Sequence, residues 1–230
     1  MIKQLRPNMA RAKNAQLFIY IVLALDVVLL ISNLFQYVLI EDIKTGKFIG
    51  DDTIDANDLR QQILGIMYLV AFIASTVVYI MWFRRAYYNL GQAIHTEYSE
   101  GWAAGGWFVP IISLFYPYKI MKELYVKTNA ILRQQISGYS HQVKLTTIGI
   151  WWALWIGSNI IERIGSKLED TETIDGVLNY TLFSMFSNVL GIILAFVAVK
   201  VIKDYHDLEK KYHEVAAQQP GEIKPPEIIL

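Results

Sequence analysis

Four long apolar stretches constrain this chain more than any other feature of its 230 residues. A helix needs roughly 20 predominantly apolar residues to cross the hydrocarbon core of a bilayer. Only 18% of the chain is charged, whereas an ordinary soluble domain carries about 25% charged residues. We therefore predict an all-α integral membrane protein, a four-helix bundle with spans at residues 17–39, 63–83, 145–161 and 177–199.

The first stretch follows four basic residues, which is also how a secretory signal begins. Its apolar part is too long for a signal, and no small-residue cleavage site of the A-x-A type closes it. We therefore expect a retained membrane anchor. Cleavage near Ser32 is the alternative.

A fifth apolar stretch, residues 101–118, reads GWAAGGWFVPIISLFYPY. Its glycines, Pro110 and Pro117 make it a poor continuous helix, because proline lacks the N–H and clashes with the preceding turn. If only the other four stretches cross, sixteen of the 21 basic residues lie on one side, which the positive-inside rule makes the cytoplasm. A fifth crossing would move five of them outside. We therefore expect cytoplasmic termini and a re-entrant or interfacial segment between the second and third spans.

The segments outside the spans are too short for an independent domain, so residues 1–218 should form a single membrane domain. Residues 84–98 should continue the second span as a helix, and residues 200–218 should continue the fourth. Residues 119–135 carry apolar and basic side chains at helical spacing, as in a helix at an anionic membrane interface. Residues 219–230 are expected to be a flexible tail.

Polar residues within the predicted spans form the first candidate site. Asp26 lies near the middle of the first span, where an ionised carboxylate costs roughly 2.5–3.5 kcal/mol. Asn33 and Gln36 share its helix face, and Asn188 belongs to a stripe of small and polar residues. One interpretation is a polar path through a small transporter or channel. The other is helix packing, since such residues let helices approach closely. The candidate intramembrane residues are Asp26, Asn33, Asn159 and Asn188.

Residues on the predicted cytoplasmic side form the second candidate site, which we name the collar. Arginines close the second span, tryptophans fit an aromatic belt, and an acidic residue that could pair with Arg85 lies in the basic helix. Simple anchoring explains such residues, because membrane interfaces select Arg, Trp and Tyr. The alternative is a pocket for a lipid or a partner protein. The collar comprises Arg84, Arg85, Asn89, Trp102, Trp107, Pro110 and Glu123.

Several chemistries find no support in the sequence. Without cysteine there is no disulfide, thiol nucleophile or Cys-based metal site. His206 and His213 share a helix face with Glu209, which we interpret as a solvated face rather than a zinc site. No hydrolase elbow, zinc-protease motif or P-loop occurs. A net charge of zero excludes a nucleic-acid partner bound by a strong basic field. We predict no cofactor, no metal and no nucleic acid.

Several motifs together resemble the bacterial membrane proteins grouped as "domain of unknown function 4328". They are WFRRAYYNL at 82–90, GWAAGGWFVPI at 101–111, PY at 117–118, MKEL at 121–124 and WWALW at 151–155. The chain departs from the family at Glu100, where proline is frequent, and at Tyr125, where tryptophan is common. The resemblance implies a multi-pass protein of the bacterial cytoplasmic membrane and brings no activity with it.

Two functional hypotheses follow. The first is a non-enzymatic binding or assembly subunit whose collar binds membrane lipids, a protein partner or a second copy of the chain. The second is a small transporter or channel with a polar path around Asp26. An enzyme that acts on lipid is a weaker third hypothesis, because no catalytic motif appears.

Overall fold

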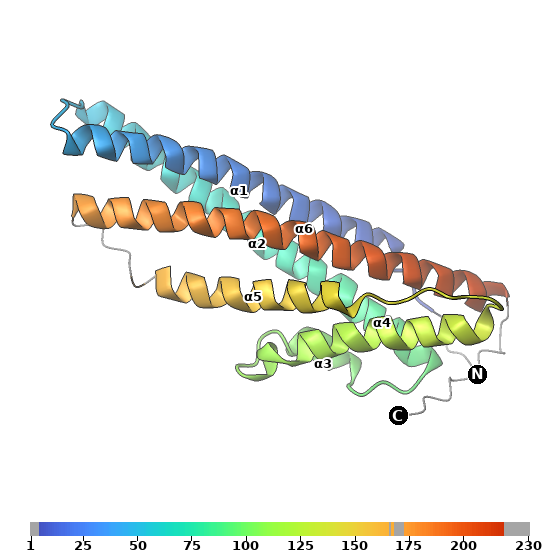
Figure 1. Cartoon of the computed structure of the whole chain (residues 1–230). Coiled ribbons are helices and arrows are strands. Elements are labelled where there is room, and N and C mark those ends of the chain that lie inside the picture. Colours follow the sequence, from blue (N-terminus) through green and yellow to red (C-terminus); the bar gives the residue numbers. More distant parts are fainter. Residues whose placement is uncertain (1–4, 166, 168–172, 219–230) are drawn as a thin grey trace. The chain divides into compact units, whose positions relative to one another are not determined.

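The computed structural model describes residues 5–165, 167 and 173–218, and the regular structure of these residues is entirely helical. The predicted all-α class is therefore confirmed. The predicted tail, residues 219–230, lies outside the described residues. Figure 1 shows the helices in chain order: α1 (Met9–Lys44), α2 (Asp51–Ala93), α3 (Glu100–Gly105), the 3-10 helix η1 (Ile112–Leu114), α4 (Tyr116–Gln135), α5 (Leu145–Gly165) and α6 (Ile174–Gln218).

Three of the described helices are long and apolar enough to cross a membrane: α1, α2 and α6. They contain 36, 43 and 45 residues and no interior proline. At about 1.5 Å per residue, each is longer than the roughly 30 Å of hydrocarbon that a span must cross. Helix α5 is not among the three, because its tryptophans, Asn159 and Glu162 lower its mean hydropathy. Its crossing stays a prediction.

The described helices contribute to two compact units. Unit 1 consists of Met1–Leu17, Thr76–Trp152 and Val199–Leu230, and unit 2 consists of Phe18–Ser75 and Ala153–Ala198. The two units divide the candidate residues cleanly, since the collar lies in unit 1 and the intramembrane polar residues lie in unit 2.

Aromatic side chains fill the centre of unit 1. Tyr79 meets the rings of Trp82, Phe83, Trp107 and Trp151 at centroid distances of 5.5 to 6.4 Å. Offset and edge-on contacts of this kind stabilise a core beyond the apolar area that they bury. Trp82, Phe83, Trp107 and Trp151 of the family motifs therefore serve the interior of this unit.

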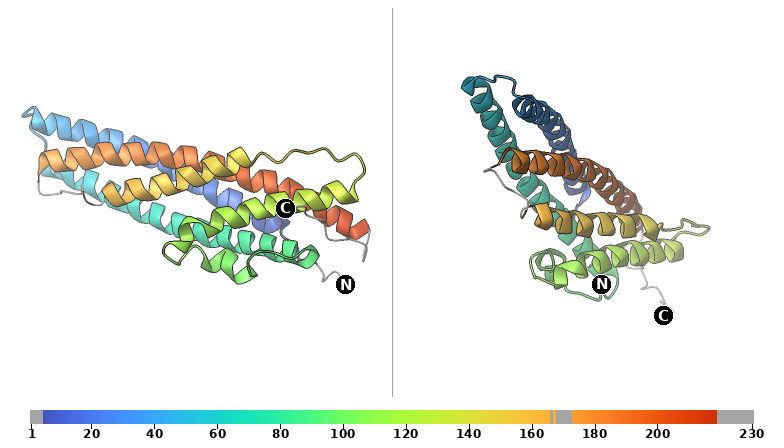
Figure 2. Two further views of the ribbon diagram at one scale, coloured as in Figure 1. Left: turned by 60° about the horizontal axis from the view of Figure 1, so that its bottom comes forward. Right: turned by 60° about the vertical axis from the view of Figure 1, so that its left-hand side comes forward.

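Helix α4 packs its apolar face on the C-terminal part of α6. The Tyr125 hydroxyl donates to the carbonyl of Val201 at 2.5 Å, and the hydroxyls of Thr128 and Tyr205 lie 3.4 Å apart. Protein therefore covers this face, and only the basic face remains for the interfacial position that we predict. Residues 136–144 then form a loop that joins the ends of α4 and α5 (Figure 2).

Helix α2 ends at Ala93, whereas we predicted a helix as far as residue 98. The prediction is wrong there because side chains of unit 1 compete for the backbone. The N–H of Glu97 donates to Glu123 Oε1 at 2.8 Å, and the N–H of Tyr98 donates to the Tyr87 hydroxyl at 3.0 Å. Bonds of this kind replace those of a further helical turn.

The apolar segment 101–118 is broken, as its glycines and prolines predicted. Between α3 and α4 the described backbone forms turns and the short η1, and the side chains of Phe108 and Ile111 are 71% and 73% exposed. Gly106 lies so close to the preceding turn that a Cβ atom there would be 2.7 Å from the carbonyl oxygen of Trp102. Apolar side chains are thus displayed at a loop tip.

Candidate functional site

Unit 2 contains a cavity of about 600 Å³ that α1, α2, α5 and α6 all line. All four predicted intramembrane residues, Asp26, Asn33, Asn159 and Asn188, lie in its wall. The structure thus brings together residues that are up to 162 positions apart in the sequence. Asn159 stands at an exposed position and donates to the carbonyl of Trp155 at 2.7 Å.

Three side-chain amides form a directed chain that ends at Asp26. Gln61 Nε2 donates to Asn33 Oδ1 at 3.2 Å, and Asn33 Nδ2 donates to Asn188 Oδ1 at 3.1 Å. Asn188 Nδ2 then donates to Asp26 Oδ1 at 3.3 Å. Each amide points its positive end toward the carboxylate, and bonds in series polarise one another. The chain therefore holds the carboxylate of Asp26 in place through Oδ1.

The other carboxylate oxygen of Asp26, Oδ2, receives no hydrogen bond from this chain of amides. The residue is 2% exposed, and Oδ2 accepts no hydrogen bond of good geometry among the described residues, although the Tyr68 hydroxyl is a hydrogen-bonding neighbour of the carboxylate. Gly191 allows the carboxylate to lie against the backbone of α6, since a Cβ atom at that position would be 2.9 Å from Oδ2. A carboxylate oxygen can accept more than one hydrogen bond, so Oδ2 is the atom on which a ligand would act.

The electrostatic character of the cavity is acidic and aromatic. Asp26 and Glu162 are its two carboxylates, and no Lys, Arg or His occurs among the described residues that line it. Aromatic rings attract cations through their negative faces. The aromatic residues of the wall are Tyr68, Phe72, Trp155, Tyr180 and Phe183. Such a wall suits a cation and disfavours an anion.

Further polar contacts in unit 2 hold its helices together. Gln36 Nε2 donates to the Thr181 hydroxyl at 2.8 Å. Arg60 donates to Ser32 Oγ at 3.0 Å and to Asn57 Oδ1 at 2.6 Å. The bonds from Gln36 to Thr181 and from Arg60 to Ser32 join different helices, as the packing interpretation expects, whereas Arg60 and Asn57 both belong to α2. Gln36 and Thr181 also line the cavity, so packing and the cavity wall share these two residues.

The sequence analysis missed the residues that α2 contributes to this wall, although a signal for them was present. Gln61, Gly65, Tyr68 and Phe72 follow one another at spacings of four, three and four, which places them on one face of α2. Because Gly65, Tyr68 and Phe72 belong to the apolar run at residues 63–83, the sequence analysis assigned them only to a membrane span. Glu162 lies three residues after Asn159 and so shares its face of α5.

The collar residues do not form one surface. Asn89 and Glu123 are buried. Glu123 accepts a hydrogen bond from the Tyr87 hydroxyl at 2.5 Å and pairs with Lys127 at 2.6 Å, so the pairing with Arg85 that we predicted is wrong. Burial, together with the bond to Glu123, holds the pKa of Tyr87 above its ordinary value.

The remaining collar residues are nearer the surface. Arg84 forms an exposed ion pair with Glu100 at 2.8 Å. Trp102 is exposed and meets the ring of Tyr116 edge-on. Pro110 lies in the exposed turn, whereas Trp107 is half-buried against the aromatic core of unit 1. Arg85 is half-buried.

A second buried carboxylate, Glu209, lies in unit 1. We interpreted its helix face as solvated, but Glu209 is only 2% exposed. It accepts hydrogen bonds from Asn8 Nδ2 at 2.9 Å and from Asn89 Nδ2 at 2.9 Å, and His213 Nε2 lies 3.9 Å away. Burial raises the pKa of Glu209 from 4.5 to about 7, against the opposing effect of the two amides and of Arg85. Nothing in the spacing of α6 revealed this, because both amide partners are remote in the sequence.

Comparison with known proteins adds the family. No curated protein and no solved structure matches the chain. The sequence profile described as "Domain of unknown function (DUF4328)" matches residues 46–207. This range covers more than two thirds of the chain and includes all the motifs quoted above. The chain therefore belongs to the DUF4328 family.

Proposed function

We propose that this protein is a small membrane carrier or channel for an organic cation, which binds in the cavity of unit 2 against Asp26. The observation that supports this proposal most is the carboxylate of Asp26, which is 2% exposed and lines a cavity of about 600 Å³ whose described wall contains no basic side chain. A cation at Oδ2 would supply a charged partner. The chain of amides orients the carboxylate through Oδ1.

Size and wall chemistry favour an organic cation over a bare ion. Ligand cavities for small molecules measure roughly 300–1,000 Å³, and this cavity lies within that range. An inorganic ion needs several oxygen ligands at short distance, whereas rings such as Tyr68 and Trp155 stabilise an ammonium or guanidinium group by its charge alone. Glu162 adds a second negative charge to the wall.

Uptake by proteoliposomes tests the proposal directly. Vesicles containing the full chain would be supplied with radiolabelled tetramethylammonium or guanidinium under an inside-negative potential. Asp26→Asn should reduce protein-dependent uptake at least tenfold, because it removes the charge but retains the shape. Asp175→Asn is the matched control, since it removes an exposed carboxylate of unit 2 that pairs with Lys44 outside the cavity. Equal uptake by Asp26→Asn and wild type would refute the proposal.

A second function, as a binding or assembly subunit, has its own supporting observation. The loop between α3 and α4 displays the apolar side chains of Phe108, Ile111 and Phe115 beside the exposed Trp102. A cluster of this kind suits a lipid surface or a protein partner. The test compares the lipids and proteins that co-purify with wild type, with Arg85→Ala and with Phe108→Ser. Identical profiles would remove this function from consideration.

Both functions share one proposed topology. In it α5 is a fourth span, both termini face the cytoplasm, residues 101–118 dip into the cytoplasmic interface, and the membrane is the bacterial inner membrane. The distribution of basic residues supports this arrangement.

A further inference from the structure

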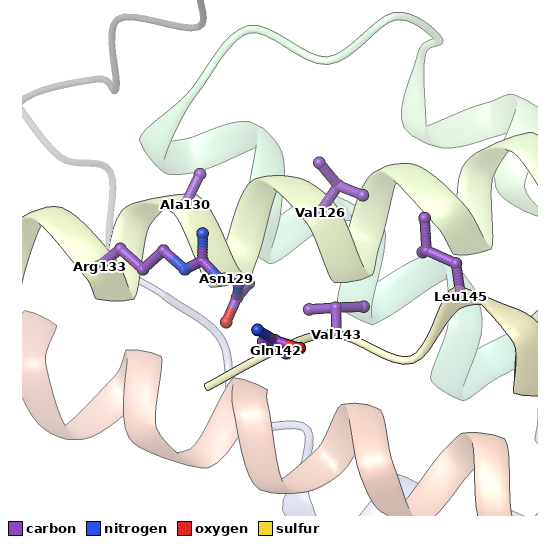
Figure 3. A pocket seen from close by; sticks show the side chains of 7 residues that line it. All are labelled: Val126, Asn129, Ala130, Arg133, Gln142, Val143 and Leu145. Carbon is purple, nitrogen blue, oxygen red and sulfur yellow. The ribbon is translucent and has the colours of Figure 1, made fainter. Parts of the chain in front are cut away.

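A groove in unit 1 has no role in either proposed function. It lies between α4 and the residues that lead into α5, and its volume is about 410 Å³. Figure 3 shows the side chains that line it: Val126, Asn129, Ala130, Arg133, Gln142, Val143 and Leu145. None of them belongs to the collar or to the cavity of unit 2.

One end of the groove is polar and positively charged. Arg133 is exposed, and its guanidinium is held by the carbonyl of His141, to which it donates at 3.0 Å. Asn129 is 6% exposed, and its Oδ1 has no hydrogen-bond partner among the described residues. In Figure 3 this oxygen points to the side of the groove on which Gln142 lies. The groove therefore offers a cationic donor and, next to it, an unused acceptor.

The other end is apolar. Val126 and Leu145 lie away from Arg133 in Figure 3, with Val143 between them and Gln142. Leu145 is the first residue of α5, the helix that we propose as the third span. No acidic side chain occurs among the described residues that line the groove. Polarity thus falls along the groove from Arg133 toward the start of a proposed membrane helix.

We infer that this groove binds a single glycerophospholipid whose headgroup carries a hydrogen-bond donor. The phosphodiester would lie on the Arg133 guanidinium, whose planar donor fork matches phosphate oxygens. A hydroxyl or ammonium of the headgroup would donate to Asn129 Oδ1. The glycerol and the first acyl carbons would cover Val126, Val143 and Leu145. Phosphatidylglycerol and phosphatidylethanolamine satisfy these requirements, whereas phosphatidylcholine has no donor for Asn129.

Native mass spectrometry of the full chain, released from detergent with defined lipids, tests the inference. Phosphatidylglycerol, phosphatidylethanolamine and phosphatidylcholine with identical acyl chains would be offered separately. We expect the first two to be retained about tenfold more than phosphatidylcholine. Arg133→Gln should lower their retention about tenfold, whereas Lys122→Gln, which removes an exposed charge elsewhere on α4, should change it less than twofold.

Two further variants separate the two ends of the groove. Asn129→Ala should bring the three lipids to equal retention, because only the donor-bearing headgroups lose a partner. Val126→Trp should block the apolar end and lower the retention of all three, and because Val126 is 41% exposed the larger side chain has room without disturbing the core. Thermal unfolding of each variant verifies that it is folded.

Several outcomes would overturn the inference. Equal retention of all three lipids by wild type, or equal losses in Arg133→Gln and Lys122→Gln, would show diffuse attraction instead of a site. Binding of water-soluble glycerophosphoglycerol as strong as that of the lipid would show that the apolar end is not used. Loss of a dimer in Arg133→Gln, with lipid retention unchanged, would assign the groove to a second copy of the chain.

Discussion

At the scale of single residues, Glu209 links folding to pH. Its pKa is about 7 in the folded protein, above its ordinary value of 4.5. Between these values the folded state keeps a proton that the unfolded state has released, so stability falls as pH rises through this window and is constant above it. The free energy of unfolding lost across this whole pH window is about 3 kcal/mol. Glu209→Gln should therefore unfold at a higher temperature than wild type at pH 8 and at a similar temperature at pH 4.5.

The comparison isolates Glu209 from its neighbours. Burial lowers the pKa of His213 and that of His206, and such shifts make stability rise with pH. Because both proteins contain these histidines, the difference retains only the part of the His213 effect that depends on Glu209, which lies 3.9 Å from it. Glu214→Gln is the matched control, since Glu214 lies on the same helix at an exposed position. A constant difference between Glu209→Gln and wild type across the pH range would contradict the prediction.

Gly191 makes a second prediction at this scale. A Cβ atom there would be 2.9 Å from Oδ2 and 3.0 Å from Oδ1 of Asp26. Overpacking in a tight contact costs about 1–3 kcal/mol, so Gly191→Ala should lower the unfolding temperature. Gly157→Ala should not, since its Cβ would meet nothing within 4 Å. Differential scanning fluorimetry in detergent measures both, and equal effects would show that the contact is unimportant.

At the scale of elements, two adjacent glycines lie where α3 ends. Gly105 is its last residue, and Gly106 follows it. At Gly106 a Cβ atom would be 2.7 Å from the backbone oxygen of Trp102 and 3.2 Å from Tyr116 Cβ, whereas at Gly105 it would meet nothing within 4 Å. Backbone cannot move aside as a side chain can. Gly106→Ala should therefore destabilise unit 1 by about 2 kcal/mol, while Gly105→Ala should be neutral or slightly stabilising.

Tryptophan fluorescence reports this difference, because Trp102 and Trp107 flank the two glycines. A shifted emission spectrum is expected for Gly106→Ala only. If both variants showed the same spectrum and stability as wild type, the close approach at Gly106 would have no energetic consequence.

At the scale of the whole molecule, topology depends on α5. The chain has no cysteine, so single cysteines can be introduced without removing native ones. Ser140→Cys and Lys167→Cys stand at exposed positions before and after α5. If α5 crosses, a membrane-impermeant maleimide added to intact cells should label Lys167→Cys and not Ser140→Cys. Labelling of both from the same side would remove the fourth span and place the termini on opposite sides.

The sequence by itself determined the helices and three candidate membrane spans. In hydrocarbon every backbone polar group must be paired within the structure, so an apolar run of sufficient length has few alternatives to a helix. The predicted ends of α4 at Gln135 and of α6 at Gln218 are also correct, although both lie outside the apolar runs. The predicted C-terminal end of α2 was wrong because the helix is ended by tertiary contacts. Glu123 and Tyr87 accept hydrogen bonds from the backbone that would otherwise continue it.

Only the tertiary structure decided which polar groups meet. Helical periodicity specifies the face on which Asn33 or Glu209 lies, but it does not specify which neighbouring helix covers that face. The partner of Asn33 on α2 is 28 residues away, and the partner of Glu209 near the N-terminus is 201 residues away. Burial then changes the chemistry of these groups, because their interactions strengthen when water is excluded. The sequence therefore identified Asp26 as unusual, and the packing of four helices around it supplied the cavity.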